Sequence, residues 1–303
     1  MNQTSDATPS GSRSVSTPVL DAALTLALAA ASEAAYDDFD GKPLQLPVGW
    51  SFVARWTGWD PEPAGGGAEE RYGLLLRNDA DPGNWIVAFR GTASLDDALD
   101  DADFPTRPFV PMQGGAAPGV DVASGFYGIY NDTGGTMTQS MRAQLLVLFE
   151  QHAPAQVYVT GHSLGGALAH LFAFDLSFGP QASAFAGLCT FASPRVGTQG
   201  WRDAYEARIA DARSTRVYNQ HDLVPDLPPK DFDYHDVGQG FPVAFERSAL
   251  PELFPLSRHA LLNYIVVLQH ALASSPQVWA GTFADAVDAK KTMVSTLPSP
   301  PSS

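Results

Sequence analysis

Residues 157–174, VYVTGHSLGGALAHLFAF, decide the fold of this sequence. The first four residues are β-branched or aromatic, which predicts a buried strand, and the residues after Leu164 repeat apolar side chains at helical spacing. Between them stands GHSLG, a G-x-S-x-G pentapeptide in the strand–turn–helix setting that gives the pattern its meaning. Gly161 and Gly165 leave room for a sharp turn that exposes the Ser163 hydroxyl. We therefore expect Ser163 to be a nucleophile rather than part of an ordinary Gly-Ser turn.

The sequence around this stretch alternates strands with helices. Short β-rich runs are predicted at 50–56, 71–77, 85–89, 188–192 and 215–218, and helical patterns at 22–35, at 138–151 and from His259 onward. Several of the strands are apolar on both faces, as in a parallel sheet covered on both sides. These features predict an α/β fold with a mostly parallel central sheet flanked by helices.

Length and composition favour one domain. The chain has 303 residues, of which 45% are hydrophobic and 17% charged, so a sizeable core is available. Residues 1–17 are rich in Ser and Thr, and the chain ends in LPSPPSS, so both ends have too little apolar surface to fold. We expect a disordered tail at 1–17, a single domain at 18–290 and a second disordered tail at 291–303.

Charge and cysteine content exclude several functions. The net charge of −15 argues against binding to nucleic acid or to an anionic bilayer. Cys189 is the only cysteine, so neither an intrachain disulfide nor a Cys-based metal centre can form, and a buried, inert thiol is expected. No calcium loop, phosphate loop or zinc-binding histidine pair fits its spacing rule, and no cofactor is expected.

The N-terminal part does not resemble a membrane anchor. No segment approaches the ~18 uncharged apolar residues of a transmembrane helix. Residues 22–35 lack the basic start of a signal peptide and are expected to form an alanine-rich first helix. The expected protein is soluble, and its sequence favours the cytoplasm over secretion.

A serine nucleophile needs a base that is oriented by an acid. In α/β-hydrolases the chain order is Ser, then Asp or Glu, then His. Asp222 follows the strand predicted at 215–218, at the carboxyl end where sites in open α/β sheets gather. Its rival Asp226 lies in a Pro-rich stretch that is typical of a turn. We expect Asp222 to be the acid.

The base is one of two histidines. His162 adjoins the nucleophile and should be a packed or hydrogen-bonded neighbour, and other histidines lie upstream of Asp222 or at a helix end. His235 and His259 remain, and order and placement favour His259, which stands where a loop meets a helix.

An acyl-transfer site also needs donors for the oxyanion. One should be the backbone N–H of Leu164, directly after the nucleophile. The strand at 85–89 runs into Arg90-Gly91-Thr92, where Thr92 could donate both its N–H and its hydroxyl. The sequence pattern is equally consistent with an ordinary turn at the end of a strand, without a role in catalysis.

Four sequence blocks together resemble a known family. FRGT at 89–92, GHSLGG at 161–166, FASPRVG at 191–197 and DLVPDLPP at 222–229 are similar to motifs of the class 3 lipases, the fungal-lipase-like α/β-hydrolases. The blocks follow the family's order, and the resemblance covers roughly residues 22–272.

This resemblance implies an α/β-hydrolase fold and a Ser163–Asp222–His259 triad, with Thr92 and Leu164 forming the oxyanion hole. It also implies that His235 belongs to a structural strand motif, because residues 259–264 match the family's His-x-x-x-x-Tyr ending. Arg258 stands where the family often has Asp.

These residues predict a serine ester hydrolase that acts on triacylglycerol or on short- to medium-chain esters. A feruloyl esterase or a phospholipase with the same triad is an alternative, as is a catalytically silent protein that binds an acyl ligand. The expected partners are small-molecule or lipid esters, with at most transient contact with lipid interfaces and no nucleic acid.

The resemblance implies that residues 94–104, SLDDALDDADF, form a short amphipathic helix over the pocket, a candidate lid. The helical period places Leu95, Ala98, Leu99 and Ala102 on one narrow face and five aspartates on the other. The alternative is a solvated acidic face on a fixed surface helix. A thin apolar stripe offers little free energy for insertion into lipid, so we expect weak interfacial activation and slower action on anionic emulsions.

Overall fold

A seven-stranded sheet organises the computed structural model, which describes residues 19–61, 65–92, 104–113, 115, 118–243, 258–274 and 278–280. Its strand order is β10-β9-β8-β7-β4-β3-β2. The strands of this sheet are β2 (Trp50–Pro61), β3 (Gly67–Asn78), β4 (Asn84–Phe89), β7 (Gln156–His162), β8 (Phe185–Phe191), β9 (Ser214–Asn219) and β10 (Gln239–Val243). Two small antiparallel pairs join β1 (Val19–Asp21) to β11 (Val278–Ala280) and β5 (Thr106–Pro108) to β6 (Asp121–Ala123).

The sheet is mostly parallel, as predicted. Strands β4, β7, β8, β9 and β10 pair in parallel, while β3 and β2 add an antiparallel edge. Because parallel strands end at the same edge, the carboxyl ends of β4, β7 and β9 lie near one another. Each of these strands is followed by one of the predicted site segments.

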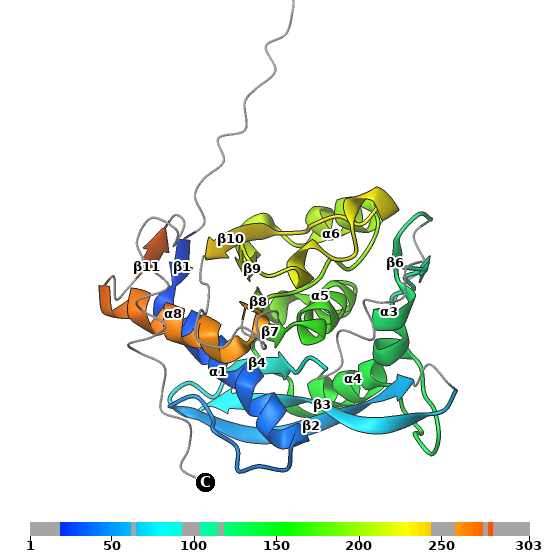
Figure 1. The fold of residues 1–303 in the computed structure, drawn as a ribbon. Coiled ribbons are helices and arrows are strands. Elements are labelled where there is room, and N and C mark those ends of the chain that lie inside the picture. Colours follow the sequence, from blue (N-terminus) through cyan, green and yellow to red (C-terminus); the bar gives the residue numbers. More distant parts are fainter. Residues whose placement is uncertain are drawn as a thin grey trace, which may run out of the picture.

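Helices cover both faces of the sheet (Figure 1). They are α1 (Ala22–Phe39), α3 (Ser124–Asn131), α4 (Met141–His152), α5 (Leu164–Leu176), α6 (Gln199–Arg208) and α8 (Leu261–Ser274). Side chains of α1 and α8 share one apolar cluster, and those of α3 to α6 share the other. Strand β4 divides between the two, with Ile86 and Ala88 in the first and Val87 and Phe89 in the second. None of the helices in the described part of the chain combines the length and apolar character that a bilayer span requires.

Helix α1 confirms the helix predicted from the alanine-rich segment. Asp21 caps it, since a carboxylate oxygen accepts the backbone N–H of Leu24 at 2.7 Å. Its small side chains, among them Ala31 and Ala35, are buried and let the helix lie close to the sheet. This close approach brings the last turns of α1, with Tyr36, to the carboxyl ends of the central strands.

Strands β2 and β3 are longer than predicted. The sequence predicts strands only over 50–56 and 71–77, but Pro61 pairs with Gly67 and Asp60 with Ala68. These small and polar residues have low strand propensity, and pairing with the partner strand overrides it.

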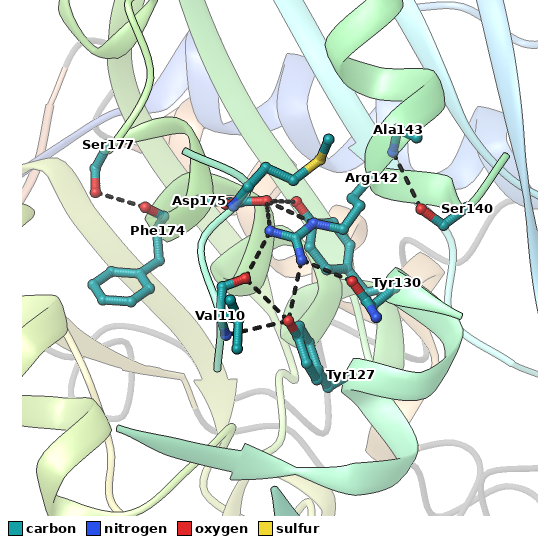
Figure 2. Close-up of polar contacts among 11 residues, drawn as sticks. Val110, Tyr127, Tyr130, Ser140, Arg142, Ala143, Phe174, Asp175 and Ser177 are labelled. Atoms are coloured by element: carbon teal, nitrogen blue, oxygen red, sulfur yellow. Dashed lines mark hydrogen bonds and ion pairs between the residues drawn. The ribbon is translucent and has the colours of Figure 1, made fainter. Parts of the chain in front are cut away.

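A buried ion pair ties the helices of one face together (Figure 2). The guanidinium of Arg142 on α4 lies 2.7 Å from the carboxylate of Asp175 on α5, and both side chains are about 5% exposed. Arg142 also donates to the hydroxyl of Tyr127 on α3 and to the carbonyl of Val110. The segment around Val110 is thereby held to three helices.

Candidate active site

The turn between β7 and α5 holds Ser163 in a strained conformation. Its backbone has φ 58° and ψ −131°, a region that non-glycine residues rarely adopt. A Cβ at Gly161 would lie 2.1 Å from the carbonyl oxygen of Gly165, and one at Gly165 would lie 2.5 Å from that of Arg90. Only glycine fits at these two positions, as the pentapeptide predicts. The turn places Ser163 at the end of β7, but the prediction of an exposed hydroxyl is wrong, because the residue is 1% exposed in the structure.

The turn after β4 abuts the nucleophile position. A Cβ added to Gly91 would lie 2.8 Å from the Cβ of Ser163, so Thr92 follows a residue in direct contact with the serine. The buried Arg90 side chain donates to the carbonyl of Gly91 at 2.7 Å and also contacts Glu70. On the other side, Leu164 is the first residue of α5, whose first N–H groups have no partner within the helix. Leu164 and Gly91, the residue before Thr92, therefore both adjoin Ser163.

Asp222 and His259 are hydrogen-bonded. The Nδ1 atom of His259 lies 2.8 Å from Oδ2 of Asp222, and the two side chains are 15% and 2% exposed. A second bond to the same oxygen comes from the hydroxyl of Tyr264, at 3.2 Å, and the N–H of Val224 donates to Oδ1 at 3.1 Å. Burial raises the pKa of Tyr264 well above its ordinary value, with the Asp222 charge adding to the shift, so its hydroxyl keeps the proton it donates.

Two polar atoms of the site are buried without a hydrogen bond to any described residue. They are Oγ of Ser163 and Nε2 of His259. Because a carboxylate only accepts, the Nδ1 atom of His259 carries the proton, and Nε2 of the neutral ring is left as an acceptor. The structure therefore shows no hydrogen bond between Ser163 and His259. In unliganded sites such a bond is often long and tightens only when substrate binds.

Asp226 and His235, the alternative candidates for the acid and the base, make other contacts. Asp226 is 77% exposed and pairs with Arg195 at 2.7 Å. His235 bonds through Nε2 to Asp233 at 2.9 Å, and its backbone pairs with Gly197 in an isolated bridge. Of the two histidines left open by the sequence, only His259 contacts Asp222 among the described residues.

His162 is hydrogen-bonded on both ring nitrogens, which confirms the expectation of a bonded neighbour. Its partners are the hydroxyl of Tyr36 at 2.8 Å and the carbonyl of His259 at 2.7 Å. The sequence reasoning missed Tyr36, Arg90 and Asn219 as parts of the site. Of these, Arg90 alone had a signal, because it lies inside the FRGT block.

Two further predictions have different outcomes. Cys189 is buried in β8, as predicted, and burial raises its thiol pKa to about 12. The candidate lid residues Leu95, Ala98, Leu99 and Ala102 lie outside the described residues.

Comparison with known proteins confirms the family resemblance. The profile of the family "Lipase (class 3)" matches residues 86–232, a span that includes Thr92, Ser163, Leu164 and Asp222. This central region of the chain is thus similar to the class 3 lipases.

The relatives include plant and fungal proteins. Phospholipase A1-II 6 of Oryza sativa subsp. japonica is 32% identical over 223 residues, covering 67% of this chain and 54% of the relative. The lipase of Rhizomucor miehei is 32% identical over 170 residues, covering 55% and 44%. The chain therefore spans about half the length of these relatives.

A solved structure described as a triacylglycerol lipase with a serine protease triad as its catalytic centre shares the fold. Its TM-score is 0.53 at 24% identity, over 72% of this chain and 78% of that one. This likeness confirms the predicted α/β-hydrolase fold.

Proposed function

We propose that the chain is a serine carboxylic ester hydrolase of the lipase and carboxylesterase type. The observation that carries the proposal is the 2.8 Å bond between His259 and Asp222 at a site where Ser163 is held strained and buried. The match of residues 86–232 to the class 3 lipase profile supports it. The proposed triad is Ser163, His259 and Asp222, and the proposed oxyanion donors are Thr92 and Leu164.

The reaction follows from these roles. Oγ of Ser163 attacks the ester carbonyl carbon while Nε2 of His259 takes the hydroxyl proton. The carbon–oxygen bond to the alcohol then breaks, and the alcohol leaves with that proton. Water attacks the acyl-enzyme, gives a proton to His259, and the acid departs as Ser163 recovers it. Asp222 stabilises the imidazolium, and the donors of Thr92 and Leu164 stabilise the oxyanion in both steps.

The proposed substrates are lipid esters or short- to medium-chain esters. The names of the relatives support both a triacylglycerol lipase and a phospholipase A1. A feruloyl esterase with the same triad and a silent acyl-binding protein are the remaining alternatives. Transient contact with a lipid interface is part of the proposal, and a transmembrane anchor is not.

The test is turnover of p-nitrophenyl butyrate by the purified chain. Replacing the nucleophile, S163A, should lower kcat by several orders of magnitude. The matched control is S177A, at the other end of α5, where the hydroxyl donates to the carbonyl of Phe174. An inactive wild type, or an active S163A, would contradict the proposal. Initial rates on tributyrin, phosphatidylcholine and methyl ferulate then identify the ester class.

We also propose, from its sequence alone, that segment 94–104 is a lid with a weak response to interfaces. Its apolar face holds only two leucines and two alanines, opposite five aspartates. Velocity against tributyrin concentration should show little rise at the solubility limit, and less on an anionic than on a neutral surface. A sharp rise that an anionic surfactant leaves undiminished would contradict it.

A further inference from the structure

A tyrosine and a histidine connect the oxyanion turn to the base. The hydroxyl of Tyr36 accepts the backbone N–H of Gly91 at 3.0 Å and bonds to Nδ1 of His162 at 2.8 Å. On its other side, Nε2 of His162 lies 2.7 Å from the carbonyl oxygen of His259. These bonds join α1, the end of β4, the end of β7 and the start of α8.

The direction of the hydrogen bonds follows from the acceptors. A carbonyl oxygen only accepts, so Nε2 of His162 carries the ring proton, and Nδ1 accepts the Tyr36 hydroxyl proton. Burial, with the neighbouring His259 ring, lowers the pKa of His162 well below its ordinary value, which keeps the ring neutral. Burial raises the pKa of Tyr36, so the hydroxyl stays protonated. In this series of three hydrogen bonds, which runs from the Gly91 N–H to the His259 carbonyl, every donor therefore has a matching acceptor.

The backbone at His259 lies just before the first residue of α8. Two side chains hold its carbonyls. His162, next to the nucleophile, bonds to the carbonyl of His259, and Nδ2 of Asn219, at the end of β9, donates to the carbonyl of Arg258 at 3.0 Å. The base is thus positioned from the ends of the strands that precede Ser163 and Asp222.

We propose that Tyr36 and His162 are positioning residues for ester hydrolysis. Tyr36 fixes the oxyanion turn through Gly91, and His162 fixes the backbone of the base relative to Ser163. Neither side chain takes part in bond making, and both act through the groups they hold. This inference rests on the proposed function.

The chain offers a matched control on the other face of the sheet. The hydroxyl of Tyr205 on α6 lies 3.1 Å from Nδ1 of His170 on α5 and 3.0 Å from Oγ of Ser214. This is again a buried tyrosine bonded to a neutral histidine. It belongs to the apolar cluster of α3 to α6, and none of its hydrogen-bond partners is in the proposed site.

The first experiment compares Y36F with Y205F in p-nitrophenyl butyrate hydrolysis and thermal unfolding. Each variant loses one hydroxyl with two bonds, so the two Tm losses should be similar. Because misplaced catalytic groups slow the chemical step, Y36F should lower kcat about 10- to 100-fold and leave KM within about three-fold. Y205F should leave kcat within about two-fold of the wild type. Equal kcat in Y36F and Y205F would overturn the proposal.

A second pair of variants separates positioning from packing. Gln at position 162 can place an amide donor near the former Nε2 and reach the His259 carbonyl, whereas Asn ends near Nδ1 and reaches only Tyr36. H162Q should therefore retain clearly more kcat than H162N at similar Tm. Equal activity of the two, or a higher activity in H162N, would overturn the role of His162. An inactive wild type or an active S163A would instead count against the proposed function.

Discussion

Asp222 and His259 are 37 residues apart in the chain and are joined by a 2.8 Å hydrogen bond between Oδ2 and Nδ1. This bond selects the ring tautomer that leaves Nε2 as an acceptor. D222N should keep the fold and lower kcat by about 10³- to 10⁴-fold, because an amide in place of the carboxylate favours the wrong tautomer. The matched control is D226N at an exposed position, which should leave kcat near that of the wild type. Equal losses in the two variants, measured by esterase assay, would contradict the assignment of the acid.

The choice between the two histidines is tested in the same assay. H259A should abolish turnover while the circular dichroism spectrum stays unchanged, because it removes the base. H235A should retain activity and lose only the bond to Asp233 and its packing. The reverse pattern would show that His235, and not His259, is the base.

The Arg142–Asp175 pair predicts a loss of stability. R142M leaves the Asp175 carboxylate buried without its cation, so the free energy of unfolding should fall by about 3–5 kcal/mol. The control is R202M, which breaks a partly exposed pair with Glu206 on α6 and should cost less than about 1 kcal/mol. Urea unfolding of both variants measures the difference. Similar losses would show that the buried pair contributes no more than a surface one.

His170 predicts acid sensitivity. Burial, with Arg216 adding a smaller effect, lowers the pKa of His170 to about 3, against about 6.5 in an unfolded chain. Between these two pKa values the unfolded state therefore binds a proton at His170 that the folded state does not bind. The stability from this group is complete above pH 6.5 and is lost as the pH falls toward 3, at about 1.4 kcal/mol per pH unit.

The variant H170Q removes this titration. Between pH 6 and pH 5, the free energy of unfolding of H170Q should fall by about 1 kcal/mol less than that of the wild type. Urea unfolding at the two pH values tests this. Equal decreases in the free energy of unfolding of the wild type and H170Q would show that the pKa of His170 is not lowered in the folded protein.

Local patterns were enough to predict the parallel sheet and the turn at Ser163. Both depend on short-range rules, namely apolar runs in the strands and small residues around the serine. The strand ends at Asp60 and Ala68 were missed because pairing with a neighbour, rather than propensity, makes them extended.

Tyr36 could not be found from the sequence. It is an aromatic residue in an alanine-rich helix, 126 residues before His162, and its role depends on how closely α1 packs on the sheet. Likewise, order and placement in the sequence favour His259 over His235, but only the tertiary contacts show which of the two bonds to Asp222. The lid stays a prediction from sequence.

The central claim is that Ser163 is the nucleophile of an ester hydrolase. Its most direct test is reaction of the folded chain with a serine-directed fluorophosphonate, followed by intact-mass measurement and peptide mapping. We predict one phosphonyl group per chain, on the peptide that contains Ser163, absent in S163A and formed far more slowly in H259A. A label on another residue, or an active esterase that takes up no label at Ser163, would contradict the account.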